Sequence, residues 1–149
     1  MQYRVSPFIG PEYYPRTQSS PYIVKALFLP SDIQYEPQII TETPEEILSI
    51  CFKEEKPRTV FTKTGFHMYI SPTEQYIGRF ANHVATALIR HEYLTKFGST
   101  NPDVVCGNVV IFGTINIPRR MIDGKDHSVP YHIVEEAIRI YDTQGSNQA

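Results

Sequence analysis

Residues 104–112 read Val-Val-Cys-Gly-Asn-Val-Val-Ile-Phe, an apolar run that is interrupted only by Gly107 and Asn108. A strand with apolar side chains at consecutive positions presents them on both of its faces, which is typical of the buried interior of a sheet. We therefore expect an interior strand here, covered on both sides. Gly107 predicts a bulge or a place where another part of the backbone approaches closely.

The other predicted strands follow from short β-branched and aromatic runs bounded by proline and glycine. Tyr22–Leu29 lies between Pro21 and Pro30 and predicts a strand. Residues 58–63 and 66–70 predict a hairpin that turns at Thr64-Gly65 and ends at Ser71-Pro72. Residues 73–79 are expected to form a looser connection.

Three helices are predicted from capping residues and from a period of about 3.6 residues. The first runs from residue 44 to about 54, with Thr43 as N-cap, Pro44 at the first position and Glu46 closing a capping box. The second runs from about Phe80 to Lys96. The third begins near residues 128–130, and its predicted buried face consists of Ile133, Val134, Ala137, Ile138 and Tyr141.

The resulting β-α-β-β-α-β-α order predicts an α+β fold with an antiparallel sheet of about four strands. It matches the split βαβ, ferredoxin-like arrangement, in which both crossover helices cover one face. We expect the C-terminal helix to cover the opposite face within the same chain, with a homodimer as the alternative. The domain is expected at 22–142, after a Pro- and Tyr-rich extended arm at 1–21 and before a frayed tail at 143–149.

Composition excludes several classes of protein. The chain has 149 residues, 41% of them hydrophobic, and a net charge of −2, which are ordinary values for a globular domain and argue against a nucleic-acid coat. No apolar stretch is long enough for a membrane span, and the N-terminal residues lack a signal-peptide core. The sequence therefore predicts a cytoplasmic protein, in the host cytoplasm if the protein is viral.

Histidine and cysteine are present without a ligand pattern. His83 and His91 are eight residues apart on one predicted helix, which is not the spacing that chelates a metal. All five histidines, which include His67, His127 and His132, are interpreted as surface or capping residues. Cys51 and Cys106 are interpreted as buried, reduced thiols, with a regulatory or catalytic thiol as the alternative. No cofactor or metal site is predicted.

Enzyme signatures are also missing from the sequence. It contains no Gly-x-Ser-x-Gly nucleophile elbow, no phosphate-binding loop and no dinucleotide fingerprint. The paired glutamates fall on predicted helices, where neighbouring residues diverge by about 100°. A short basic loop of Arg119, Arg120 and Lys125 leaves weak nucleic-acid binding as an alternative.

Two segments carry one resemblance. Asn82-His-Val-Ala-Thr-Ala-Leu88 and Val105-Cys-Gly-Asn-Val-Val-Ile-Phe-Gly113 resemble the Asn-x-x-Ala-Thr helix and Gly-x-Val-Val-Ile-x-Gly strand of a small domain family of unknown function. That family occurs chiefly in bacteriophages, mobile elements and large algal viruses. The resemblance spans roughly residues 22–117, and the Pro/Tyr arm departs from it. It implies a viral or phage accessory protein and brings no catalytic residues.

The residues of this motif also have a structural interpretation. Asn82 can bond local backbone, Ala85 allows close helix packing, Thr86 can face the neighbouring strand, and Gly107 and Gly113 allow close backbone contact. A small-molecule site or small enzyme that uses Asn82, Thr86 and the Gly107-Asn108 edge is the alternative.

The leading functional hypothesis is a non-enzymatic accessory protein that binds another protein, either a second copy or a host or viral partner. The aromatic residues of the arm are the predicted partner contacts, since rigid aromatics are common in interfaces. These residues are Tyr3, Phe8, Tyr13 and Tyr14.

Overall fold

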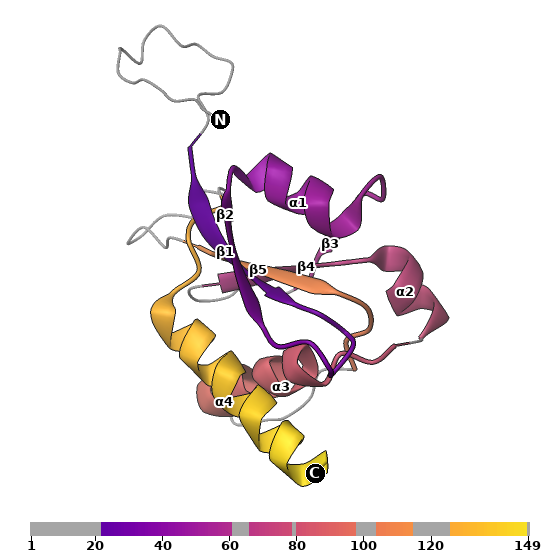
Figure 1. Cartoon of the computed structure of the whole chain (residues 1–149), viewed down its shortest axis with the longest axis vertical. Helices are drawn as coiled ribbons and strands as arrows, with labels where there is room; N and C mark the ends of the chain where they lie inside the picture. Colours follow the sequence, from indigo (N-terminus) through magenta and orange to yellow (C-terminus); the bar gives the residue numbers. More distant parts are fainter. Residues whose placement is uncertain (1–21, 61–65, 79, 98–103, 115–125, 149) are drawn as a thin grey trace, which may run out of the picture.

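Strand β5 (Val109–Gly113) lies in the middle of a five-stranded antiparallel sheet, with order β2-β1-β5-β4-β3. The computed structural model describes residues 22–60, 66–78, 80–97, 104–114 and 126–148. Figure 1 shows the sheet between α1 on one side and α3 and α4 on the other. The other strands are β1 (Val24–Leu29), β2 (Gln38–Glu42), β3 (Arg58–Thr59) and β4 (Phe66–Ile70). The predicted α+β class with one mainly antiparallel sheet is confirmed.

The burial of β5 agrees with the prediction from its sequence. All five of its residues are buried, and it pairs with β1 on one side and β4 on the other. The strand is shorter than predicted, because residues 104–108 leave the ladder. Gly107 there has a φ of +84°, and Cys106 forms only an isolated bridge to Ala81.

The sheet has one strand more than predicted. β2 follows β1 as a hairpin and forms an edge of the sheet, paired from Val24 with Glu42 to Phe28 with Gln38. Because β2 reverses the chain before α1 (Pro44–Phe52), α1 connects the two edge strands across one face. Across the sheet, the four predicted strands follow one another in the order first, last, third and second. The split βαβ arrangement would place the first strand between the last and the third, so that part of the prediction is wrong.

Each face of the sheet has its own core. Val110 and Phe112 of β5 face α1, where they join Ile47, Phe52 and Ala26. Val109 and Ile111 face α3 (His83–Phe97) and α4 (Tyr131–Gln148). The prediction that α1 and α3 share a face, opposite α4, is therefore wrong, although α4 does cover the sheet within one chain as expected.

The start of α1 confirms the predicted cap. Thr43 Oγ1 accepts a hydrogen bond from the Glu46 N–H at 3.2 Å, and Pro44 occupies the first turn. The reciprocal bond of the predicted capping box is made by Glu42 instead of Glu46, since the Thr43 N–H donates to Glu42 Oε1 at 3.3 Å. The helix ends at Phe52, and Lys53 follows with a φ of +56°.

A helix, α2 (Pro72–Ile77), occupies the segment that was predicted to be a loose connection. Ser71 caps it through its Oγ, which accepts from the Glu74 N–H at 3.1 Å. The signal in Ser71-Pro72 is the same as in Thr43-Pro44, and it is a helix start as well as a strand end. Helix α3 begins at His83, later than predicted, because Phe80 has a φ of +56° and Ala81 bridges to Cys106.

The apolar face of α4 differs from the predicted one by a small rotation. Ile133, Ala137 and Ile140 are buried against the sheet, and Val134 and Tyr141 are half-buried beside them. Ile138 was expected in this face but is 44% exposed. The helix continues to Gln148, past the predicted end at residue 142. Among the described residues, no helix is long and apolar enough to cross a membrane.

The burial of α4 predicts a large loss of stability for a charge at Ile140 and a small one for a charge at Ile138. Ile140→Asp should lower the free energy of unfolding by about 3–5 kcal/mol, because it places an unpaired carboxylate in the core. Ile138→Asp should change it by about 0.5 kcal/mol or less, as at other exposed positions. Urea unfolding of both variants measures the difference. Light scattering serves as control, since a halved mass for Ile138→Asp would mean that α4 is a dimer interface.

Candidate functional site

Asn82, the first residue of the predicted motif, joins three parts of the fold. Its Nδ2 donates to the carbonyl oxygens of Leu29 at 2.9 Å and Gly107 at 2.8 Å. Its Oδ1 accepts from the Ala85 N–H at 3.0 Å, which caps α3. The side chain is completely buried. Both amide hydrogens and the oxygen therefore bond backbone, which is the structural interpretation of this residue and leaves no N–H for a ligand.

The other residues of the motif close the same seam. Thr86 Oγ1 accepts from the Val105 N–H at 2.9 Å, and Ala85 is fully buried. A Cβ on Gly107 would lie 2.8 Å from Glu74 Cβ, so this position is the predicted close approach. Gly113 is closer still, since a Cβ there would lie 2.1 Å from the Ser128 carbonyl oxygen. Asn108 is exposed, and its Oδ1 accepts from the Ser31 N–H at 3.0 Å.

A buried polar cluster that the sequence analysis missed lies on the α1 face of β4. His67 Nε2 is 2.7 Å from Asp126 Oδ1, and His67 Nδ1 is 2.6 Å from Thr114 Oγ1. The Tyr69 hydroxyl donates to Asp126 Oδ1 at 2.9 Å. The rings of His67 and Tyr69 also contact Phe112. The interpretation of His67 as a surface or capping residue is wrong, since it is only 7% exposed.

The His67 cluster has a chemical and a structural interpretation. A hydroxyl bonded to an imidazole that is oriented by a carboxylate is the arrangement that activates a nucleophile. Neither of the two pockets described below includes any of these residues. The cluster does hold Thr114 and Asp126 next to the Gly113–His127 bridge, where the two backbones exchange hydrogen bonds at 2.7 and 3.0 Å. We therefore assign it to fixing these two chain segments against the sheet.

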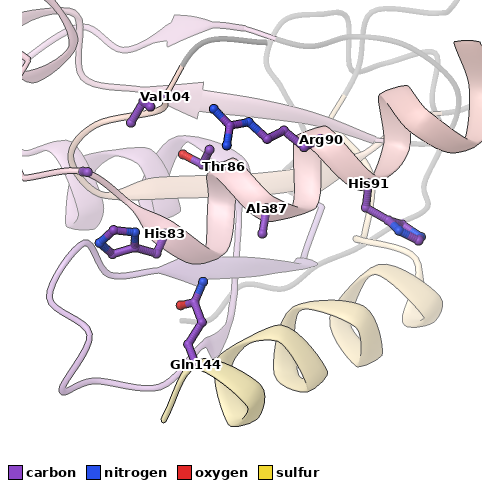
Figure 2. Close-up of a pocket in the computed structure, with 8 residues that line it drawn as sticks. His83, Thr86, Ala87, Arg90, His91, Val104 and Gln144 are labelled. Atoms are coloured by element: carbon purple, nitrogen blue, oxygen red, sulfur yellow. The ribbon is translucent and has the colours of Figure 1, made fainter. Parts of the chain in front are cut away.

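The larger described pocket, about 460 Å³, lies beside α3 and is also lined by Gln144 of α4. Figure 2 shows Arg90 running back along α3 toward Thr86 and Val104, while Gln144 reaches from α4 toward His83 and Ala87. The Gln144 Oε1 is buried and has no hydrogen-bond partner in the described part of the chain. Thr86 is thus the one polar residue of the predicted seam that reaches this pocket. A second pocket, about 360 Å³, lies between α3 and α4 beside the Arg139–Glu136 ion pair.

Four large apolar side chains are exposed on α2, just after it and at Val104, whose carbonyl oxygen bonds Gln75 of α2. Tyr76 is 92% exposed, Phe80 60%, Ile77 49% and Val104 43%, and we call this set the corner surface. Phe80 was predicted to be buried in the helix stripe, and it is not, because α3 starts after it. Val104 belongs to both the corner surface and the pocket.

Polar bonds hold α2 in place, although it buries none of its residues. The Glu55 carboxylate accepts from Ser71 Oγ at 2.7 Å and from the Thr73 N–H at 3.0 Å. These bonds lower the pKa of Glu55. At the other side, Gln75 bonds the Val104 carbonyl oxygen and the Cys106 N–H, both at 2.9 Å. Helix α2 is therefore fixed to the domain on two sides, through its first turn and through Gln75.

Several predicted residues lie outside the described ranges. These are the arm residues Tyr3, Phe8, Tyr13 and Tyr14 and the basic loop of Arg119, Arg120 and Lys125. Both cysteines are described and are free thiols. Cys106 is buried as predicted, and Cys51 is half-buried, where burial raises the pKa of its thiol to about 11. That value keeps Cys51 protonated at neutral pH and argues against a reactive thiolate.

Within the described ranges, no group of three or more histidine, cysteine or carboxylate side chains is placed to hold a metal ion. No protein-family model, curated protein or solved structure matches this chain. The corner surface and the larger pocket are therefore the features of this chain that bear on its function.

The bonds of Asn82 predict a large loss of stability on its removal. Asn82→Ala leaves two buried carbonyls and one helix N–H without partners, and each such group costs about 1–3 kcal/mol. We expect a decrease of about 3 kcal/mol or more in the free energy of unfolding, measured with urea. The control is Asn108→Ala, which removes one exposed bond and should cost about 1 kcal/mol or less. Equal losses in the two variants would contradict this assignment.

The position of Tyr69 predicts a dependence of stability on alkaline pH. Burial, reinforced by the Asp126 carboxylate, raises the pKa of Tyr69 above its usual value of 10.0. The folded state thus keeps its proton when the unfolded state loses it, so this stabilisation is complete below pH 10 and decreases above it. Tyr69→Phe should cost about 1–3 kcal/mol at pH 7. The difference from the wild type should shrink in unfolding experiments above pH 10, and a constant difference would contradict the raised pKa.

Proposed function

We propose that this chain is a non-enzymatic protein-binding module and that the corner surface contacts the partner. The observation that carries the proposal is the exposure of Tyr76, Ile77 and Phe80 on a segment that polar bonds fix in place. Exposed apolar side chains that gather at one site mark interaction surfaces, and aromatic residues contribute most of the energy there. A fixed segment also loses little conformational entropy on binding.

The size of the corner surface favours a peptide segment of another protein over a second copy of this chain. A standard interface between two folded proteins involves about 20–30 residues on each side. The corner surface has four large side chains on one short helix and the adjoining chain. A short extended or helical segment with apolar side chains fits a surface of this extent. Homodimerisation through the same residues is the alternative, and light scattering, described below, tests it.

The remaining sequence predictions belong to this proposal. The viral or phage origin implied by the family resemblance stays a prediction, as do the arm contacts through Tyr3, Phe8, Tyr13 and Tyr14. A cytoplasmic location is supported by two cysteines that are free thiols, which suits a reducing compartment. The polar groups of Asn82 and Thr86 bond backbone, which supports the protein-binding proposal over an enzyme at that seam.

The proposal predicts that peptides selected against the full chain bind through the corner surface. A library of random peptides with free C-termini is selected on the wild type, and affinities are measured by fluorescence polarisation. Tyr76→Ser and Phe80→Ser should each weaken the selected peptides about tenfold or more, which corresponds to about 1.4 kcal/mol. Ile50→Ser is the matched control, because Ile50 is 51% exposed on α1, outside the corner surface.

Two results would overturn the proposal. In one, the selected peptides bind the Tyr76 and Phe80 variants as tightly as the wild type. In the other, no peptide is enriched and the wild type is a dimer by light scattering that Phe80→Ser converts to a monomer. The second result would assign the surface to contact between copies of this chain.

A further inference from the structure

The pocket beside α3 contains an acceptor that the described residues leave without a donor. Gln144 lines this pocket, and its Oε1 is buried and forms no hydrogen bond within the described part of the chain. Buried polar atoms without partners are rare in folded proteins, because burial removes the bond to water without replacing it. A group that enters the pocket and donates an N–H or O–H would satisfy this oxygen.

The same pocket contains a cation that the described part of the chain leaves without an anion. Arg90 forms no ion pair with any described residue and, with His83, lies along the α3 side of the pocket. Figure 2 shows its guanidinium folded back along the helix toward Thr86, while Gln144 approaches from α4. A guanidinium binds a carboxylate through two parallel N–H bonds. The pocket therefore offers a charged end for an anion and a separate acceptor for a donor.

Apolar side chains complete the lining. Ala81, Ala87 and Val104 line the pocket together with the polar groups. Its volume of about 460 Å³ lies within the range of roughly 300–1,000 Å³ that is typical of sites for small ligands. Mostly apolar walls with a few placed polar groups are also typical of such sites. The ligand therefore combines a carboxylate, a nearby N–H and an apolar group.

We propose that this pocket binds the C-terminal residue of a peptide. The terminal carboxylate pairs with Arg90, the N–H of the same residue donates to Gln144 Oε1, and its apolar side chain lies on Ala81, Ala87 and Val104. Capture of a C-terminal carboxylate is a known mode of peptide recognition. The inference rests on the proposed function, because Val104 joins the pocket to the corner surface, over which the preceding residues of the peptide would lie.

Small molecules test the pocket without any knowledge of the partner. The isotopically labelled full chain is titrated, by NMR, with N-acetyl-leucine, N-acetyl-leucine amide, 4-methylpentanoate and free leucine. N-acetyl-leucine should shift the backbone amides of Ala87 and Val104 in a saturable way. The amide lacks the carboxylate and 4-methylpentanoate lacks the N–H, so each should bind about tenfold more weakly or worse, a loss of about 1.4 kcal/mol. Tighter binding of free leucine would assign the site to a free amino acid and overturn the proposal.

Variants connect the binding to the named side chains. Arg90→Gln and Gln144→Leu should each weaken N-acetyl-leucine about tenfold. Arg58→Gln is the matched control, since Arg58 is an exposed arginine on β3, outside the pocket. Gln144→Leu should not lower the midpoint of urea unfolding, because the Gln144 Oε1 forms no hydrogen bond within the described part of the chain. Unchanged binding in the Arg90 and Gln144 variants would overturn the proposal.

The proposal for the pocket and the proposal for the corner surface can be overturned independently of each other. Tyr76→Ser should bind N-acetyl-leucine as the wild type does, because Tyr76 does not line the pocket. If peptides are selected through Tyr76 and Phe80 but bind equally well with an amidated C-terminus, the pocket proposal is wrong and the protein-binding function stands. If N-acetyl-leucine binds through Arg90 and no selected peptide depends on the corner surface, the function is wrong and the carboxylate pocket stands.

Discussion

The buried carboxamide of Asn82 is the interaction on which the arrangement of this fold depends. It bonds the carbonyl at the end of β1, the carbonyl of Gly107 before β5 and the first turn of α3. Two strand segments and a helix that are distant in the sequence are thereby fixed at one point. A methyl side chain at Ala85 and the missing side chain at Gly107 allow these segments to approach closely. Since the amide is fully buried, each of its bonds replaces one that water would have made.

The position of the candidate site follows from this seam. By fixing the start of α3, Asn82 leaves Phe80 in front of the helix, with its side chain turned outward and its carbonyl accepting from the Gly107 N–H at 2.8 Å. Gln75 fixes α2 to the same chain segment, and Glu55 fixes it to the turn that follows α1. Hydrogen bonds hold α2 in position, and none of its residues is buried in the core. The apolar side chains of α2 can therefore remain exposed and form part of the corner surface.

Much of the local structure could be predicted because its causes are local. Thr43 and Pro44 define the start of α1 through a cap that spans four residues, and the continuous apolar run at β5 shows that both faces of that strand are covered. Helix α2 could have been predicted from Ser71 and Pro72, which repeat the Thr43 signal. The hairpin strand β2 gave a weaker pattern, because an edge strand buries few side chains and Ile39 is exposed.

The sequence by itself determined the α+β class, most element positions, the buried strand and the local bond of Asn82 to the first turn of α3, since these depend on capping, periodicity and residue size within a few positions. Only the tertiary structure decided which helix covers which face, because an amphipathic stripe shows that a face is buried and not what it is buried against. The contact of His67 with Asp126 joins residues 59 positions apart, and no local pattern specifies such a pair. The pocket of Arg90 and Gln144 exists because α4 passes beside α3, which depends on the docking of both helices on one sheet face.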